Sequence, residues 1–151
     1  RTDLPLCSLD NAGRLGQSAC VSDRPYVEHD DMYLAPSFQE GGVGRVLLDY
    51  QVTLHVGSDA LVIETPFDVS VGSTTVHVVP GESAQLAGAG ALLHAVCRSV
   101  QLRKNGVLRV EFADDRVLSV NPSREFDPWH VFVAGRNMVV CTPGGDLSFF
   151  G

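Results

Sequence analysis

Basic side chains are scarce in this sequence. Its 151 residues contain 11 lysines and arginines against 18 aspartates and glutamates, which gives a formal net charge of −7 at pH 7. Proteins that bind nucleic acids or anionic membranes neutralise phosphates with a basic patch. We therefore expect neither a nucleic acid nor a membrane surface as the partner of this chain.

Long hydrophobic runs are also missing. No apolar stretch reaches the roughly 18 residues that a membrane-spanning helix needs. Hydrophobic residues make up 44% of the chain and charged residues 19%, which is the balance of a globular protein rather than a disordered one. A chain of this length predicts one domain, with room for little more than an appendage.

Cysteine is sparse, and no Cys-X-X-Cys spacing occurs among the four present. Cys97 and Cys141 lie in apolar, strand-like runs, where a reduced cysteine behaves as a small hydrophobic residue. This favours a reducing compartment and a cytoplasmic location, although a bridge between Cys7 and Cys20 would argue against it. The chain begins with Arg1, and no signal-peptide pattern lies within it.

The chain divides at about residue 42. Residues 1–42 hold several prolines and glycines without a sustained period of 2 or 3.6, which is typical of an irregular arm. Residues 43–151 alternate apolar and polar side chains in short runs separated by turn residues, which predicts β-strands. We expect one helix, over Glu82–Ala95, where alanines and leucines gather.

Two stretches of the second region are alike. Val52–Pro66 aligns without a gap on Leu108–Pro122, with apolar residues on apolar ones and Asp59 on Asp115. A second, shorter likeness joins Val76–Gly81 to Val139–Gly144. This predicts an α+β, β-rich fold of two related antiparallel β units, packed with one helix as a small sandwich or half-barrel.

Candidate chemical sites are weak. Cys7, Cys20 and the run His29–Asp30–Asp31 could supply zinc ligands, but their spacing is long and irregular, so we expect no metal. Cys141 precedes a glycine turn and could act as a nucleophile, yet no histidine partner is identifiable. The glycine runs at 41–44 and 143–145 lead into strands, whereas a phosphate loop opens a helix.

Charged pairs have structural interpretations. Asp114–Asp115 is typical of a hairpin turn rather than a pair of catalytic acids. Glu64 could pair with Arg98 or Arg45 and orient neighbouring strands. We therefore expect no catalytic residue and no cofactor, and we predict that the protein is not an enzyme.

Several motifs together resemble a known family. These are Gly44–Val46, Asp49–Leu54, Ile63–Phe67, the hairpin ending Phe112–Asp115, the strand at Trp129 and Val140–Gly145. They are similar to a small actinobacterial family described only as domain of unknown function 6188, over about residues 43–150. The resemblance implies no activity. Small actinobacterial proteins of this general kind are suspected immunity proteins of toxin loci, an analogy that carries little weight on its own.

The sequence favours a protein that binds another protein or a second copy of itself. We expect contact through the sheet surface and the arm, with Asp30, Asp31, Tyr33 and Trp129 as partner-binding residues. Trp129 could instead be a core anchor, the role that the sequence favours, because tryptophan serves both roles. One alternative is an immunity protein that neutralises a basic toxin. Another is a small-ligand carrier or an enzyme with a pocket between the β units.

Overall fold

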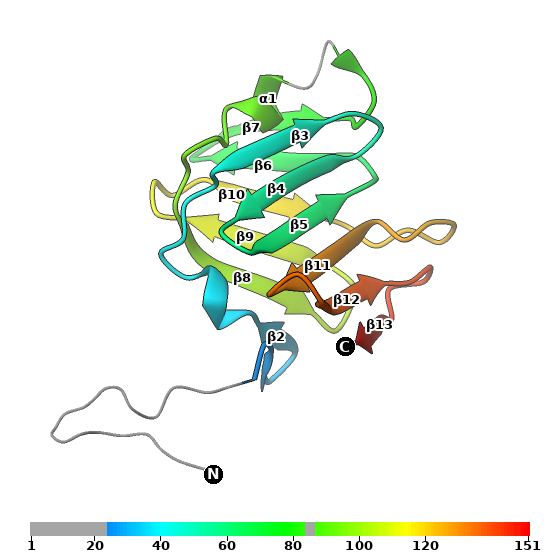
Figure 1. The fold of residues 1–151 in the computed structure, drawn as a ribbon. Helices are drawn as coiled ribbons and strands as arrows, with labels where there is room; N and C mark the ends of the chain where they lie inside the picture. Colours follow the sequence, from blue (N-terminus) through cyan, green and yellow to red (C-terminus); the bar gives the residue numbers. More distant parts are fainter. Residues whose placement is uncertain (1–23, 84–86) are drawn as a thin grey trace, which may run out of the picture.

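Two antiparallel sheets packed face to face make up the fold (Figure 1). A computed structural model describes residues 24–83 and 87–151. The larger sheet has the strand order β1-β2-β8-β9-β10-β6-β7, and the smaller has the order β13-β12-β11-β5-β4-β3. The strands are β1 (Val27–His29), β2 (Met32–Leu34), β3 (Arg45–Leu48), β4 (Val52–Val56), β5 (Asp59–Ile63), β6 (Phe67–Val71), β7 (Thr74–Val78), β8 (Cys97–Arg103), β9 (Leu108–Phe112), β10 (Val117–Val120), β11 (Trp129–Val133), β12 (Asn137–Cys141) and β13 (Leu147–Phe150).

The predicted repeat organises both sheets. The first copy lays β3, β4 and β5 in the smaller sheet and then sends β6 and β7 into the larger one. The second copy does the reverse: β8, β9 and β10 lie in the larger sheet, and β11 and β12 cross to the smaller. Each copy therefore completes the other's sheet, and the predicted β-rich fold of two related antiparallel units is confirmed.

The exchanged hairpins both pair antiparallel with the sheet that receives them. Leu61 of β5 lies opposite Val131 of β11, and Val117 of β10 lies opposite Ser70 of β6. Leu61 and Val117 align in the sequence repeat, but Leu118 rather than Val117 faces the core, so β10 is shifted by one residue relative to β5. Since one copy alone would leave a three-stranded sheet and a detached hairpin, neither copy has enough partners to be stable by itself.

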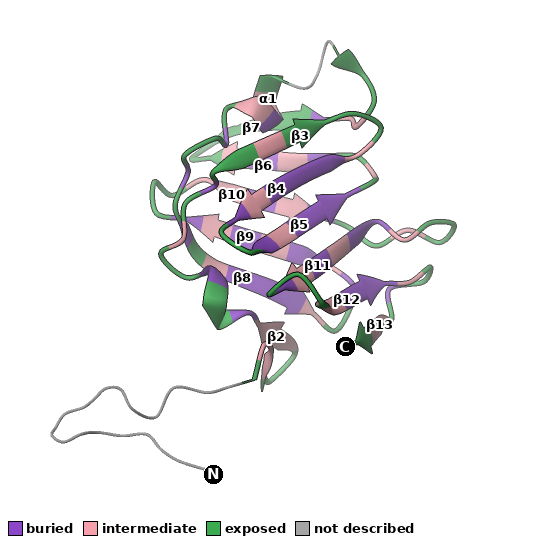
Figure 2. Ribbon diagram, viewed as in Figure 1, coloured by how far each residue is buried: buried purple, intermediate pink, exposed green. Residues whose placement is uncertain are grey.

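The core lies between the sheets (Figure 2). Alternation along each strand sends every second side chain inward, and the inward set is almost entirely apolar. Its largest fully buried members are Trp129, Phe38, Phe67 and Phe112. Leu92, from the connection between the two copies, closes the core beside β3 and β7, where the helix packs.

The helix expected over Glu82–Ala95 is much shorter among the described residues. Only α1 (Ala87–Gly90) is helical, and turns follow it. His94 adopts a positive φ of 72°, and the chain then bonds to Val43, which directs it into β8. Gly88 fits closely on β7, where an added Cβ would lie 2.7 Å from a methyl carbon of Val76. Packing on the sheet and the low helix propensity of glycine therefore limit this helix.

The expected boundary at residue 42 is wrong for the described part of the arm. β1 and β2 form a hairpin that extends the larger sheet through β8. A 3-10 helix, η1 (Pro36–Phe38), follows, and Phe38 is fully buried. These residues belong to the domain, because non-local pairing with β8 holds a segment whose own sequence has little periodicity. Residues 1–23 lie outside the described residues.

Within residues 24–83 and 87–151, no helix is long and apolar enough to cross a membrane.

Candidate functional site

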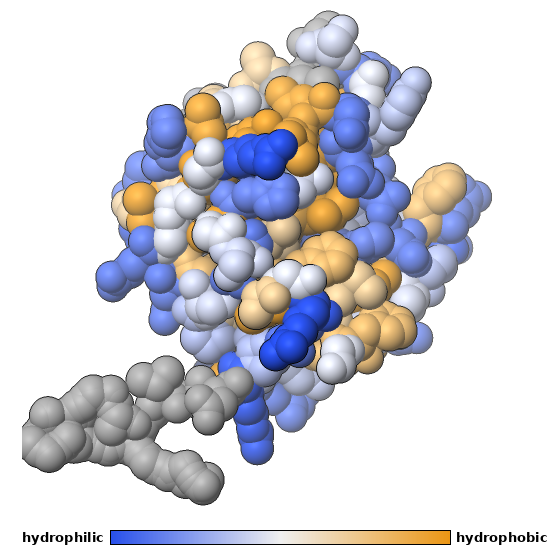
Figure 3. Space-filling view, in the orientation of Figure 1, coloured by the Kyte–Doolittle hydropathy of each residue, from blue (hydrophilic) through white to orange (hydrophobic). Residues whose placement is uncertain are grey.

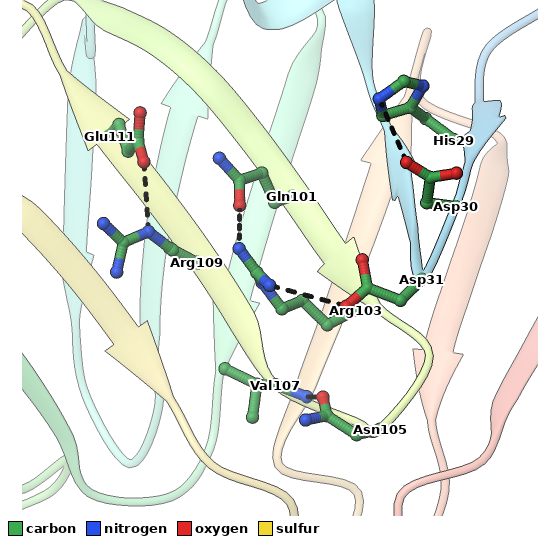
Figure 4. Close-up of polar contacts among 9 residues, drawn as sticks. All are labelled: His29, Asp30, Asp31, Gln101, Arg103, Asn105, Val107, Arg109 and Glu111. Atoms are coloured by element: carbon green, nitrogen blue, oxygen red, sulfur yellow. Dashed lines mark hydrogen bonds and ion pairs between the residues drawn. The ribbon is translucent and has the colours of Figure 1, made fainter.

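The larger sheet presents a polar outer face. Alternation places Gln101, Arg103, Arg109 and Glu111 there, on the side away from the core. Figure 4 shows these side chains in a row across β8 and β9. The guanidinium of Arg109 donates to Glu111 at 3.1 Å, and that of Arg103 donates to Gln101 at 2.7 Å. The charges on this face are therefore matched within the chain.

The β1–β2 turn carries the acidic residues predicted to meet a partner. Asp30 occupies the turn with a positive φ of 55°, and its carboxylate lies 3.7 Å from the ring of His29. Asp31 lies 3.8 Å from the guanidinium of Arg103, as Figure 4 shows. Glu28 pairs with Lys104. The acidic character of this turn is thus partly neutralised by basic side chains of the domain.

Tyr33 lies at the junction of the two sheets. Its ring meets that of Phe149 edge to face, with centroids 4.9 Å apart, and the ammonium of Lys104 lies 5.4 Å from its centroid. The glutamate partner of Lys104 raises the pKa of that ammonium. Tyr33 is half-buried, so it both anchors β2 against β13 and offers an edge to solvent.

Trp129 is fully buried, with 0% of its surface exposed. Its indole N–H donates to the carbonyl of Gly106 at 2.9 Å. The expectation that Trp129 contacts a partner is therefore wrong for this structure, and the alternative role of core anchor is confirmed. Alternation explains the result, because β11 directs Trp129, Val131 and Val133 into the core cluster.

The smaller sheet presents an apolar outer face. β5, β11 and β12 direct Val62, His130 and Val140 outward in one row, and Ala60, Phe132 and Met138 outward in the next. Val62 and Val140 are buried among their neighbours, and the other four are half-buried. Phe150 of β13 continues the second row and is 55% exposed. Figure 3 shows hydrophobic side chains over β11 and β12 and over β3, interrupted by hydrophilic ones. We call this surface the apolar face.

Apolar side chains on the outer face of a sheet can indicate a binding surface. Antiparallel sandwiches usually alternate apolar residues inside with polar residues outside. The larger sheet follows that rule and the smaller sheet does not. Large exposed apolar patches mark binding surfaces more often than isolated apolar residues do. The contrast between the two outer faces therefore makes the apolar face the main candidate site.

One polar pair interrupts the apolar face. The carboxylate of Glu64 lies 3.0 Å from Nε2 of His130, without the geometry of a hydrogen bond. The expected pairing of Glu64 with Arg98 or Arg45 is wrong, since Arg98 instead bonds to Asp115 at 3.2 Å. β11 inserts beside β5, so His130 takes the position near Glu64 that a sequence-local argument assigned to arginine.

The described cysteines are buried in the core. Cys97 and Cys141 are free thiols, and burial raises the pKa of each to about 11. A nucleophilic cysteine acts as the thiolate, which such a pKa makes scarce near neutral pH. Cys141 accordingly has a packing role. Cys7 and Cys20 lie outside the described residues, so the expectations about their bridge and about zinc concern a part of the chain that is not described.

Metal ligands do not gather in the part of the chain that the structure describes: it holds no group of three or more histidine, cysteine or acidic side chains placed to bind a metal ion. His29 and Asp30 share the β1–β2 turn, but no third such ligand joins them there.

A half-open hollow of about 180 Å³ lies beside β2, η1 and β8. Its walls include Leu34, Pro36 and Val100, with Gln39 and Ser99 as polar members. The pocket expected between the β units would have to occupy the sandwich interior, which Phe67, Phe112 and other core residues fill.

The apolar face was missed in the sequence, although a signal was present. His130–Phe132 and Met138–Val140 read as alternating strands, but three of their four outward residues, Phe132, Met138 and Val140, are apolar like the inward ones. A strand that is apolar on both sides is covered on both sides in many proteins. Only the register between β11, β12 and β5 brings these outward residues into one surface.

Comparison with protein-family models gives one match. The model of a family of unknown function (DUF6188) matches residues 34–151, which run from the end of β2 through β13. Neither the curated proteins nor the solved structures contain a match to this chain.

Proposed function

This chain belongs to the DUF6188 family of unknown function, and we propose that it is a non-enzymatic protein-binding or assembly protein that acts through the apolar face. The observation that carries the proposal is the contrast between the outer sheet faces. The face of the larger sheet is polar and internally paired, whereas that of the smaller sheet presents Phe132, Met138 and Phe150.

The chemistry of the apolar face suits a protein partner. Interfaces between proteins combine a desolvated apolar centre with a polar rim. Here Phe132 and Met138 form the centre, while Glu64 and His130 supply a polar pair at the side. Aromatic residues are enriched at such contacts because they bury much surface for few rotatable bonds, and methionine because its flexible thioether adapts to the partner.

The β1–β2 turn is proposed as a second contact. Asp30 is exposed and carries a carboxylate whose one described partner is the imidazole of its neighbour. Asp31 and Tyr33 stand beside it. A basic partner surface would be steered toward this turn, and added salt would slow the encounter.

The alternative functions receive less support. Neutralising a basic toxin would use acidic charge, yet Glu28 and Asp31 already pair with Lys104 and Arg103. A carrier or an enzyme would need a pocket with converging polar groups, and the hollow beside β2 and β8 is lined mostly by apolar residues, with Gln39 and Ser99 as polar members. The suggested reducing, cytoplasmic setting remains part of the proposal, because the two described thiols are unpaired.

The test is capture of partners from the native host with two matched variants. Phe132→Glu and Phe150→Glu place charges on the apolar face, whereas Ser119→Glu places one on the polar face of β10. Circular dichroism and thermal unfolding verify that each variant folds. Proteins retained by the parent chain and by Ser119→Glu, but lost from both phenylalanine variants, would support binding at the apolar face.

One outcome would contradict binding at the apolar face. If both phenylalanine variants retain the same proteins as the parent chain, the apolar face is not the binding surface. A variant with Asp30→Asn and Asp31→Asn tests the turn separately. Loss of binding in this variant alone would move the site to the β1–β2 turn.

A further inference from the structure

β3 forms a free edge of the smaller sheet. Among residues 24–83 and 87–151, only β4 pairs with it, from Arg45 opposite His55 to Leu48 opposite Val52. The chain just before β3 is already engaged, because Val43 exchanges backbone hydrogen bonds with His94 and Ala95. The unpaired part of the edge therefore begins at Arg45.

The turn after β3 shows which of its backbone N–H and carbonyl groups face β4 and which face solvent. The N–H of Asp49 donates to the carbonyl of Gln51 at 3.1 Å, which continues the β3–β4 ladder by one position. In an antiparallel ladder, successive residues direct their backbone groups to opposite sides. Leu47 therefore bonds toward β4, while Val46 and Leu48 direct their N–H and carbonyl groups toward solvent.

We propose that a second copy of this chain occupies that edge, so that two β3 strands pair antiparallel across a twofold axis at Leu47. Facing residues then share a side of the sheet. Val46 of one copy lies opposite Leu48 of the other, and their outward backbone groups exchange hydrogen bonds. The two smaller sheets become one continuous sheet. This proposal does not depend on what binds the apolar face.

Charge complementarity selects this register. With Leu47 on the axis, Arg45 of each copy faces Asp49 of the other. Arg45 makes no side-chain hydrogen bond or ion pair with any other residue that the structure describes, so it is available. A register centred on Val46 would place Arg45 opposite Leu47 and Asp49 opposite Val43, whose backbone is already bonded.

The ends of the paired strands also fit. Tyr50, at the tip of the β3–β4 turn, is 91% exposed. In the proposed register the turn that carries it comes near Gly44 of the second copy, where an added Cβ would meet nothing within 4 Å. An aromatic ring that lies across from a strand glycine covers backbone that would otherwise be exposed to solvent. Leu47 and Leu48, which are both exposed, would be covered at the same interface.

The larger sheet supplies a comparison. Among the described residues β7 forms a free edge of that sheet, and its residues are also mostly exposed. It lacks the charge match, because its imidazole, that of His77, already bonds to Asp68 of its own sheet at 2.7 Å. Substitutions on β7 therefore serve as matched controls for substitutions on β3.

The first experiment measures the mass of the full chain in solution. Sedimentation equilibrium from micromolar to submillimolar concentration is expected to approach twice the 16.2 kDa of one chain. Leu47→Lys brings two ammonium groups together on the axis and is expected to weaken association at least about tenfold, by like-charge repulsion. Val76→Lys on β7 should leave it unchanged. A single-chain mass at every concentration, or equal effects of the two lysines, would overturn the proposal.

Two further variants test the register itself. Arg45→Asp and Asp49→Arg should each weaken association, and the double variant should restore it, because the facing charges are exchanged. Leu47→Cys in a Cys7→Ser, Cys20→Ser background should form an interchain disulfide under mild oxidation, whereas Val76→Cys should not. Failure of the double variant to restore association, or absence of the Leu47→Cys bridge, would refute this register.

Discussion

The indole N–H of Trp129 donates to the carbonyl of Gly106 at 2.9 Å, and this bond joins the two sheets. Trp129 begins β11 in the smaller sheet, and Gly106 lies in the turn between β8 and β9 of the larger one. Cys141 directs its thiol to the same carbonyl, 3.5 Å away. The exchange of hairpins between the repeats brings these residues together, so the contact depends on the complete fold.

Replacing Trp129 by phenylalanine should destabilise the protein. The change removes the donor to Gly106 and leaves a cavity in a fully buried site, and we expect a loss of about 2–4 kcal/mol in the free energy of unfolding. Urea unfolding followed by circular dichroism measures it, since the variant lacks the chain's one tryptophan. Phe126→Leu, at an exposed position, should change stability by less than about 0.5 kcal/mol. Equal effects would show that the bond and the packing contribute little.

Gly106→Ala should cost more than Gly57→Ala. Both glycines adopt positive φ, +95° and +60°, so both substitutions strain the backbone. At Gly106 the new Cβ would also lie 2.6 Å from the Cα of Gly145, whereas at Gly57 it would meet nothing. We expect about 1–2 kcal/mol at Gly57 and at least about 1 kcal/mol more at Gly106, from denaturant midpoints. A smaller cost at Gly106 would mean that the turn containing Gly145 moves freely.

We predict that Asp59 stabilises the fold, although it is the first residue of β5 and directly follows a hairpin turn. Its carboxylate is buried and accepts hydrogen bonds from the hydroxyl of Ser37 at 2.6 Å and the N–H of Ala134 at 2.8 Å. Asp59→Ala leaves both donors without a partner, so we expect a loss of about 2–4 kcal/mol. Asp115→Ala, at the equivalent position in the repeat, should cost about 1 kcal/mol or less, because Asp115 is exposed. Chemical unfolding of the two variants compares them directly.

Stability should fall as the solution becomes alkaline. Burial raises the pKa of the Cys97 and Cys141 thiols from 9.0 to about 11. Between these values the unfolded chain has lost protons that the folded chain keeps, so the free energy of unfolding decreases as pH rises. Urea midpoints at pH 8 and pH 10.5 measure the slope. A Cys97→Ala, Cys141→Ala variant should show a shallower slope, and an unchanged slope would assign the effect to other groups, such as the buried Tyr26 phenol, whose pKa is also raised.

The hairpins were predictable because their signals are local. Alternation in β4 and β5, the Asn105–Gly106 turn and the turn at Asp114–Asp115 each depend on a few neighbouring residues, and the structure has strands and turns at these places. β1 and β2 escaped detection because β8 stabilises them, through the pairing of Tyr33 with Leu102. The helix was overestimated for the opposite reason: its alanines favour helix locally, but the contact of Gly88 with β7 limits it.

The candidate site shows the same division. Asp30, Asp31 and Tyr33 could be selected as polar or aromatic residues in a segment of low periodicity, and Tyr33 does stand at a junction of the sheets. Trp129 was ambiguous because composition does not show which face of a strand a side chain occupies. The apolar face could not be predicted, since it is formed by side chains from β5, β11, β12 and β13 that meet only through their registers.

By itself, the sequence determined the strands, their turns and the internal repeat, because alternation and turn chemistry act over a few residues. It also established the charge balance and the matching positions of the two copies. Only the tertiary structure decided that the copies exchange hairpins, that Trp129 faces the core and that one outer face is apolar. Those outcomes depend on which strands pair and in which register, and such pairings join residues far apart in the chain.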